Sequence, residues 1–305
     1  MKNSSSSPKT MNKITAPLGA SLVVVSSIFY ASYGIWTTLM GNFFGGYTAS
    51  ALRSILVLVI LVPMAFLYKQ LGPVNLRRNW TSLTGLIASS LFVWGPLYYA
   101  VLHAGIGIAL AVNYASIVIG MFFFGKLFAG ERFTRDKLLS TVLGIIGLFF
   151  VFSPDISNLR WIALAAAVLS GLSCAANSVA AKKISYNPTQ STISVWVTSV
   201  VANIFMALLI GEKIPAIGLH IQWLYLVFFA IASVGASYTL IKGLKLIEAG
   251  AAGILGLLEI VFGVLFGLIF FGERIGGIVW VGLIIIIVSA AIPYIKDYNV
   301  KRGTL

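Results

Sequence analysis

Long apolar stretches recur along this chain of 305 residues, and short polar connections separate them. Each stretch approaches the roughly 20 apolar residues that a helix needs to cross a lipid bilayer. Strands of a membrane β-barrel would be only about 10 residues long and would alternate in polarity, which these stretches do not. The sequence therefore predicts ten membrane-spanning helices, at about 18–40, 47–68, 80–102, 106–127, 138–153, 160–181, 190–211, 221–244, 249–271 and 275–295.

The composition agrees with this pattern. Hydrophobic residues make up 59% of the chain and charged residues 10%, with a mean hydropathy of +0.99. Soluble domains usually contain about 25% charged residues. The connections are too short for a separate soluble domain. The predicted fold class is an all-α integral membrane protein whose main partner is the lipid bilayer.

Lysine and arginine are distributed unevenly among the connections. With the N-terminus inside, inner segments hold seventeen of them and outer loops only Arg160, Lys213 and Arg274, while Arg53 lies within a helix. Positively charged loops stay on the cytoplasmic side, so we expect both termini in the cytoplasm and the protein in the plasma or inner membrane. A basic face beside anionic lipid explains the net charge of +13 without nucleic acid.

A Gly-Glu-Arg pattern occurs twice, at residues 130–132 and 272–274, each time between two apolar stretches. The first copy follows the fourth predicted helix and the second follows the ninth. Because five is an odd number, the second five-helix unit is expected to be inverted relative to the first, as in many secondary carriers. The motif itself is expected to be structural, with glycine permitting a sharp turn and glutamate accepting hydrogen bonds at a helix start.

The duplication sets the predicted domain organisation. A disordered cytoplasmic tail covers residues 1–17, the first five-helix repeat covers 18–155, the second covers 156–297, and a short cytoplasmic tail covers 298–305. Substrate is then expected near the bilayer midplane, between the two repeats.

Clusters typical of enzymes are missing from the sequence. It has no Gly-x-Ser-x-Gly elbow, no paired intramembrane aspartates and no phosphate-binding G-x-x-x-x-G-K-[ST] loop. Cys174 is the only cysteine, and the two histidines are isolated. We therefore expect no enzymatic activity, no cofactor and no metal site. Gly263 and Gly267 are spaced for close helix packing.

Two charged residues lie inside predicted helices, where a charge is costly and usually functional. Arg53 either snorkels to the outer interface, faces the cavity or pairs with a carboxylate. Glu259 is either a neutral hydrogen-bonded packing residue, a proton-coupling carboxylate or a ligand for a substrate amine. Both are candidates for coupling, and Glu259 is also a candidate for the substrate cavity.

Amphipathic side chains away from the helix ends are further candidates for contact with substrate, whereas aromatics near the ends usually form interface belts. These candidates are Tyr30, Tyr33, Trp94, Tyr98, Asn113, Tyr114, Asn177 and Tyr238.

The chain resembles the drug/metabolite transporter superfamily, and within it the EamA family of permeases and exporters. The resemblance rests on the ten helices, the doubled Gly-Glu-Arg and Arg53 early in the second helix. The resemblance covers about residues 18–295. It implies a secondary carrier whose cavity is lined by helices 1, 3, 4, 6, 8 and 9. Asn113-Tyr114 is similar to the start of a helix 4 motif in aromatic amino acid exporters. Ser116–Val118 and Ile260-Val261 stand where family members commonly have proline.

The function expected from the sequence is secondary active transport by alternating access. Few charges in the predicted lining favour small neutral, zwitterionic or amphipathic metabolites, and the resemblance favours export of amino acids or related compounds. Alternatives are carriage of nucleosides, organic cations or drugs, and a non-transporting membrane scaffold. The expected partners are a small-molecule substrate and a proton gradient, with the protein a monomer or a homodimer.

Overall fold

A computed structural model describes residues 15–131, 134–152, 160–213, 215 and 218–302. Within these ranges the chain is helical and contains no strand. Most of the tail predicted to be disordered, the last three residues and Arg132 of the first Gly-Glu-Arg lie outside them. The described helices are α1 (Thr15–Ala31), α2 (Tyr33–Met40), α3 (Gly46–Leu67), α4 (Leu76–Ser90), α5 (Gly95–Ala104), α6 (Ile106–Ala129), α7 (Arg135–Phe152), α8 (Trp161–Lys183), α9 (Pro188–Ile210), α10 (Ile221–Leu244), α11 (Ala249–Gly256), α12 (Leu258–Phe271) and α13 (Gly277–Arg302).

These helices form the ten spans that the sequence predicted. In the described part of the chain, eight segments are long and apolar enough to cross a membrane. Helix α7 and the apolar part of α13, Gly277–Pro293, complete the ten. Three spans consist of two helices each, namely α1 with α2, α4 with α5 and α11 with α12. The apolar pattern alone gives no sign of these three interruptions.

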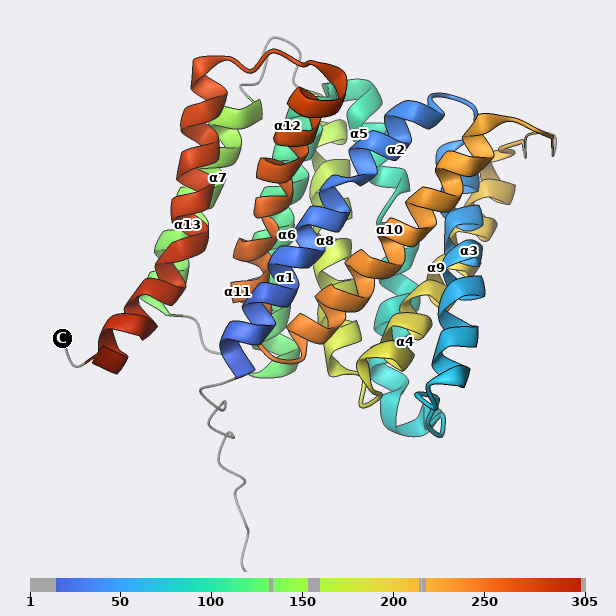
Figure 1. The fold of residues 1–305 in the computed structure, drawn as a ribbon, viewed down its shortest axis with the longest axis horizontal. Coiled ribbons are helices and arrows are strands. Elements are labelled where there is room, and N and C mark those ends of the chain that lie inside the picture. The colour runs from blue at the N-terminus through green and yellow to red at the C-terminus, as the bar shows by residue number, and fades with distance from the viewer. Residues whose placement is uncertain (1–14, 132–133, 153–159, 214, 216–217, 303–305) are drawn as a thin grey trace, which may run out of the picture.

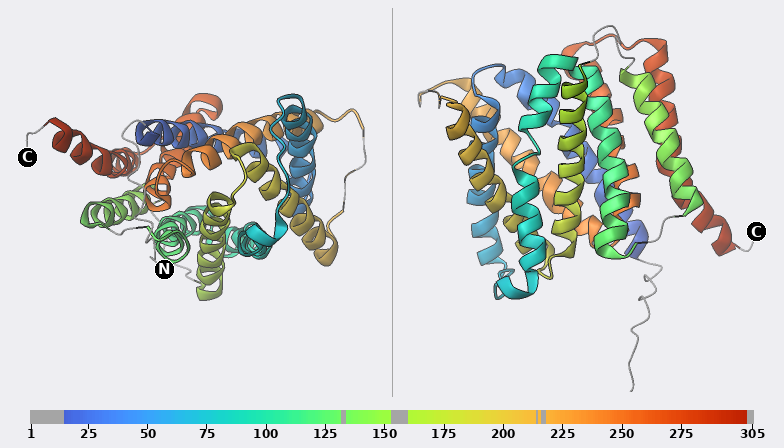
Figure 2. Two further views of the ribbon diagram at one scale, coloured as in Figure 1. Left: turned by 90° about the horizontal axis from the view of Figure 1, so that it is seen from below. Right: turned by 180° about the vertical axis from the view of Figure 1, so that it is seen from behind.

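The spans pack as a bundle with a helix pair at each edge (Figure 1). Helices α7 and α13 lie side by side at one edge, and α3 and α9 at the other, as the view from behind also shows (Figure 2). Between them, α6 packs along α8, and α1 packs along α10. Each edge pair joins one helix from each half of the sequence, so the two halves are packed together across the whole molecule.

Glycine permits close approach where α7 meets α13. A Cβ atom on Gly147 would lie 2.9 Å from the Gly282 carbonyl oxygen, and one on Gly282 would lie 2.7 Å from the Gly147 carbonyl oxygen. The expected packing role of Gly263 and Gly267 is wrong in this structure. Nothing lies within 4 Å of a Cβ on Gly263, and Gly267 faces Glu273 just beyond the end of its own helix.

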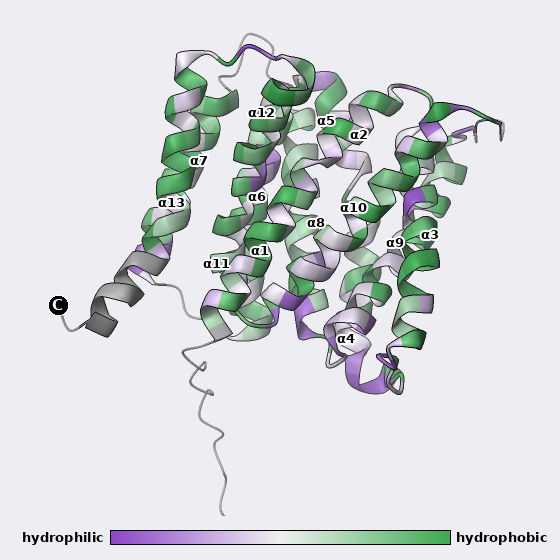
Figure 3. Ribbon diagram, in the orientation of Figure 1, coloured by the Kyte–Doolittle hydropathy of each residue, from purple (hydrophilic) through white to green (hydrophobic). Residues whose placement is uncertain are grey.

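The outer surface is mostly apolar, whereas polar ribbon gathers at the helix ends (Figure 3). We call the end at which α6 and α8 terminate and α11 begins the basic face, because Lys126, Lys182 and Lys183 lie there. The end at which α12 terminates and α6 begins is the opposite face. Apolar side chains exposed between the two faces suit a hydrocarbon environment.

Candidate substrate-binding site

A hydrogen bond between Tyr114 and Glu259 joins the two halves of the chain inside the bundle. The Tyr114 hydroxyl of α6 donates to Glu259 Oε1 at 2.8 Å. Glu259 lies in the first turn of α12, just after an irregularity in which Leu257 N bonds to Ile254 O at 3.1 Å. This i to i−3 bond tightens the helix locally. Both side chains are half-buried, so a carboxylate is held within the bundle but is not sealed off.

Arg53 lies in a cage of aromatic rings. Its guanidinium carbon is 4.3 Å from the ring centroid of Phe229, 5.0 Å from Trp94, 5.1 Å from Tyr33 and 5.5 Å from Trp196. Cation–π attraction is worth about 2 kcal/mol or more per ring where water is excluded. The residue is 2% exposed, so the snorkelling interpretation is wrong.

The Arg53 guanidinium has no anionic partner among the described residues. Its Nε donor is buried without a hydrogen-bond acceptor, and none of the described carboxylates forms an ion pair with it. The interpretation that it pairs with a carboxylate of the chain is therefore wrong for this part of the structure. Aromatic rings offset the charge but leave the Nε–H donor unpaired, and a buried unpaired donor costs about 1–3 kcal/mol. The cage is thus an environment in which an incoming anion would be bound strongly.

Tyr30 and Tyr33 lie between the two charged residues. Their ring centroids are 5.1 Å apart in an edge-to-face arrangement, and Tyr33 is one wall of the Arg53 cage. Tyr30 is within electrostatic range of both Arg53 and Glu259. The two tyrosines flank the irregularity at Ser32 where α1 gives way to α2. The two tyrosines are therefore close to both the carboxylate and the guanidinium.

Trp94 is positioned by a turn that interrupts the third span. Residues 91–94 separate α4 from α5, and the turn exposes the Val93 carbonyl. Ser170 Oγ of α8 donates to this carbonyl at 2.6 Å and accepts from Asn113 Nδ2 of α6 at 2.9 Å. Asn113 is 3% exposed, and its contacts are those of a residue that braces the turn beside the cage.

This brace gives a first prediction. Ser170→Ala removes the hydroxyl that donates to the Val93 carbonyl and accepts from Asn113 Nδ2, which is left with only its longer bond to the Ala167 carbonyl at 3.3 Å. We expect the free energy of unfolding to fall by about 2 kcal/mol, measured by chemical unfolding in detergent micelles. In the control, Ser194→Ala, only a half-buried bond to the Gln190 carbonyl within one helix is lost. Equal losses in the two variants would contradict the bracing role.

The remaining predicted residues lie outside this cluster in the structure. Asn177 Nδ2 donates to Ser89 Oγ at 3.0 Å and to Ser90 Oγ at 3.1 Å, joining α8 to α4. Lys242 Nζ lies 5.7 Å from the Tyr238 ring centroid. Tyr98 is 56% exposed. Their contact with substrate stays a prediction.

Two cage residues were not predicted from the sequence. Trp196 and Phe229 face Arg53 from α9 and α10, and the Trp196 indole N–H donates to Ser237 Oγ at 2.8 Å. Trp196 is in the middle of its span, away from the interface positions that tryptophan usually takes. That position is the signal that would have identified it.

On the basic face, burial lowers the pKa of the Lys245 ammonium to about 8. Its Nζ donates to the Ile184 carbonyl at 2.7 Å. An unfolded lysine has a pKa of about 10.4, so between pH ~8 and ~10.4 the unfolded chain binds more protons than the folded one. Stability is therefore expected to rise with pH through this window, and Lys245→Met is expected to abolish the rise. Chemical unfolding across this pH range measures it; an unchanged profile in Lys245→Met would contradict it.

Ten apolar spans, three of them interrupted beside a buried polar cluster, define a multi-pass membrane protein of the transporter class. The chain belongs to the EamA-like transporter family, whose model matches twice, at residues 17–153 and 161–294. The family lies within the superfamily that the sequence indicated.

Individual relatives share about a quarter or less of their residues with this chain. A riboflavin transporter from Rhizobium johnstonii is 26% identical over 294 residues, covering 94% of each chain. Solute carrier family 35 member G1 of Homo sapiens is 23% identical over 246 residues, covering 73% of this chain but only 64% of the human protein. A crystal structure of another protein superimposes with a TM-score of 0.77 at 18% identity, covering 92% of this chain and 98% of that one. At this identity the superposition shows a shared fold.

Proposed function

We propose that this protein is a secondary active transporter of the plasma membrane that exports small zwitterionic or amphipathic metabolites, such as aromatic amino acids, by alternating access. The observation that carries the proposal is the separation of a half-buried carboxylate from a buried guanidinium. Glu259 and Arg53 form no ion pair with each other, and tyrosines lie between them. Two opposite charges kept apart at helix irregularities suit a ligand with charges of both signs.

The chemistry of the cluster supports a specific pose. The Glu259 carboxylate and the Tyr114 hydroxyl suit a substrate amine, and the Arg53 guanidinium suits a substrate carboxylate in bidentate geometry. The rings of Tyr30, Tyr33 and Trp94 offer faces for an apolar or aromatic body. A relative is a riboflavin transporter. This relative favours a second candidate substrate, a planar neutral compound such as a flavin. Such a compound would stack on the same rings and would not need Arg53.

Reciprocal contacts at the two ends of α3 and α9 support an inverted relation of the halves. At the opposite face, Glu212, just beyond α9, accepts from Thr48 N of α3 at 2.7 Å. At the basic face, Gln70, just beyond α3, is hydrogen-bonded to Thr189 of α9. Each helix thus ends by binding the start of the other. Two units of opposite orientation generate this pattern, with both termini and the basic face in the cytoplasm.

Counterflow in proteoliposomes tests the proposal. Vesicles loaded with unlabelled phenylalanine, tyrosine, leucine, uridine, riboflavin or tetraphenylphosphonium are diluted into trace labelled compound. We expect transient accumulation with the aromatic amino acids, and none with uridine or the organic cation. Vesicles containing the Tyr114→Phe protein serve as control, because this change removes a single hydroxyl and is expected to slow counterflow without abolishing folding. Counterflow with riboflavin alone favours the second candidate, and none with any compound contradicts the proposal.

A further inference from the structure

The two copies of the Gly-Glu-Arg pattern adopt the same local geometry. Gly130 and Gly272 have φ angles of +66° and +64°, the left-handed conformation that ends a helix and favours glycine. Glu131 N bonds to Gly125 O at 3.2 Å, and Glu273 N bonds to Gly267 O at 3.2 Å. Each glutamate side chain folds back over the glycine six residues earlier, where a Cβ would clash with its Oε2.

Among the described residues, only the first copy binds a second helix. Glu131 Oε2 accepts from Ala249 N, the first residue of α11, at 2.7 Å. Its Oε1 is paired with Lys182, whose Nζ also donates to the Ile247 carbonyl at 2.7 Å. The side chains of Glu131 and Lys182 are 11% and 17% exposed. A partly buried carboxylate at a helix N-terminus is a favourable electrostatic arrangement. The end of α6 is therefore held firmly on the start of α11.

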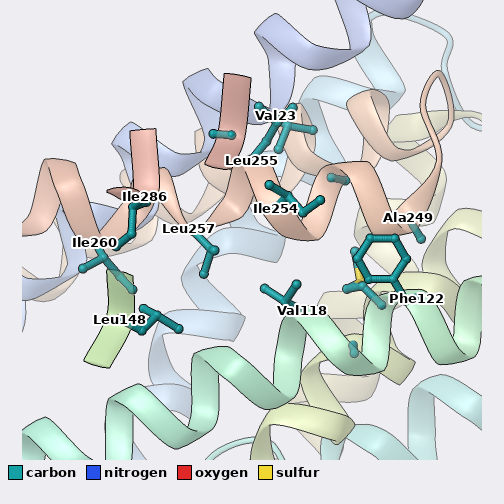
Figure 4. Close-up of a cluster of buried hydrophobic side chains, with 14 of the residues drawn as sticks. Val23, Val118, Phe122, Leu148, Ala249, Ile254, Leu255, Leu257, Ile260 and Ile286 are labelled. Atoms are coloured by element: carbon teal, nitrogen blue, oxygen red, sulfur yellow. The ribbon is translucent and has the colours of Figure 1, made fainter. Parts of the chain in front are cut away.

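Helix α11 is packed tightly where this contact holds it. All residues from Ala249 to Leu255 are buried. A Cβ on Gly250 would clash with the Phe122 ring, and one on Gly253 would lie 3.1 Å from Met121. Phe122 of α6 lies directly beside Ala249 (Figure 4). On the basic-face side of Glu259, α6 and α11 are therefore packed closely against each other.

The second copy lacks these contacts. Glu273 is exposed and forms no ion pair or side-chain hydrogen bond with the described residues. At the same face, Ile106 at the start of α6 is 66% exposed. A Cβ on Gly263 of α12 would meet nothing within 4 Å. On the opposite-face side of Glu259, α12 is thus free of the close contacts that α11 makes with α6.

The α3–α9 pair shows that this asymmetry is specific. Its reciprocal contacts are formed at both faces, by Glu212 at one and Gln70 at the other. In the described part of the chain, the pair formed by α6 with α11 and α12 has its glutamate contact at the basic face and none at the opposite face. A pair tied at both ends suits a static part of the bundle, whereas a pair tied at one end suits a moving part with two arrangements.

We propose that Glu131 and Glu273 are the alternating latches of the transport cycle. In the state seen here, Glu131 binds the N-terminus of α11 and closes the basic face. In the other state, Glu273 binds the N-terminus of α6 and closes the opposite face, while Glu131 releases α11. This proposal rests on the proposed inverted relation of the halves. The Glu131 latch is the stronger one, because α8 ends in Lys182-Lys183 whereas α2 ends in Leu39-Met40 and offers no cation to Glu273.

Cysteine reactivity in the purified, detergent-solubilised protein tests the latches without requiring transport. In a Cys174→Ala background, Met121→Cys reports on the closed side and Gly263→Cys on the open side. Glu131→Gln is expected to raise the rate of maleimide labelling of Met121→Cys about tenfold, since it removes a charged hydrogen-bond acceptor, and to slow labelling of Gly263→Cys. Adding Glu273→Gln to Glu131→Gln is expected to restore fast labelling of Gly263→Cys.

Two further variants make the test decisive. Ala249→Pro removes only the N–H that Glu131 binds, at the first helical position where proline fits well, and is expected to act like Glu131→Gln even if the latter folds poorly. Glu212→Gln is the matched control, because it weakens a glutamate cap on α3 and is expected to change both rates less than about twofold. Unchanged labelling of Met121→Cys in both Glu131→Gln and Ala249→Pro would overturn the Glu131 latch. Slow labelling of Gly263→Cys in the protein carrying both Glu131→Gln and Glu273→Gln would overturn the Glu273 latch. Either result leaves the transport proposal standing, since counterflow decides that separately.

Discussion

The Glu259→Gln protein is expected to exchange substrate across the membrane but to lose accumulation driven by a pH gradient. Glutamine has nearly the shape of glutamate and still offers an oxygen to the Tyr114 hydroxyl, which bonds Glu259 Oε1 at 2.8 Å. It cannot bind and release a proton, however. One pH unit is worth about 1.4 kcal/mol per proton, which sets a limit of about tenfold accumulation for one coupled proton. We expect this factor to fall to about 1 in Glu259→Gln.

Uptake of labelled phenylalanine into proteoliposomes with an imposed pH difference measures the effect, and counterflow without a gradient serves as the internal control. Tyr114→Phe is the matched variant, because it removes the partner of Glu259 but keeps the carboxyl group, and accumulation should persist at a lower rate. If Glu259→Gln accumulates phenylalanine with unchanged pH dependence, Glu259 is not the coupling group.

The spans of this fold could be predicted because each one is a long apolar stretch bounded by charge. The irregularities at Ser32 and Leu257 could not, because neither position carries a proline or another strong helix-breaking residue. Helix α6 is continuous through Ser116–Val118, whereas the ninth span tightens at Leu257 although Ile260-Val261 replaces the common proline. Such distortions are set by tertiary contacts, which a periodic pattern does not encode.

The candidate site was predictable where burial of charge is costly. Glu259 and Arg53 stood out because each interrupts an apolar span, and Tyr114 because it follows Asn113 in a recognisable pair. The structure separates these neighbours, since Tyr114 reaches Glu259 while Asn113 binds Ser170 of α8. Adjacent helical residues point about 100° apart, so only one of the two can face Glu259.

The binding partner of the glutamate in the repeated motif could not be predicted from the sequence. The sequence indicated a structural role at a helix start, and Glu131 does accept a bond from the first residue of a helix. That helix is α11, 118 residues further along the chain, rather than the helix that follows the motif. A local motif does not encode so distant a partner.

Arg53→Gln is expected to abolish discrimination between a carboxylate and its amide. Phenylalaninamide has a neutral amide in place of the carboxylate that Arg53 would bind, so the unmodified protein should bind the acid about tenfold to a hundredfold more tightly, the range expected for a hydrogen bond to a buried charge. In Arg53→Gln the two affinities should agree within about twofold. Arg53→Lys keeps the charge but loses the planar fork, so we expect partial discrimination.

Quenching of intrinsic tryptophan fluorescence provides the measurement, since Trp94 and Trp196 both border the guanidinium at 5.0 and 5.5 Å. Arg160→Gln, at an exposed arginine just before α8 on the opposite face, is the matched control and should leave discrimination intact. If the unmodified protein binds the acid and the amide with equal affinity, or binds neither, Arg53 does not bind the substrate carboxylate. The aromatic cage alone would then stabilise the guanidinium. Counterflow of riboflavin in that case would shift the assignment to a neutral planar substrate held by the same rings.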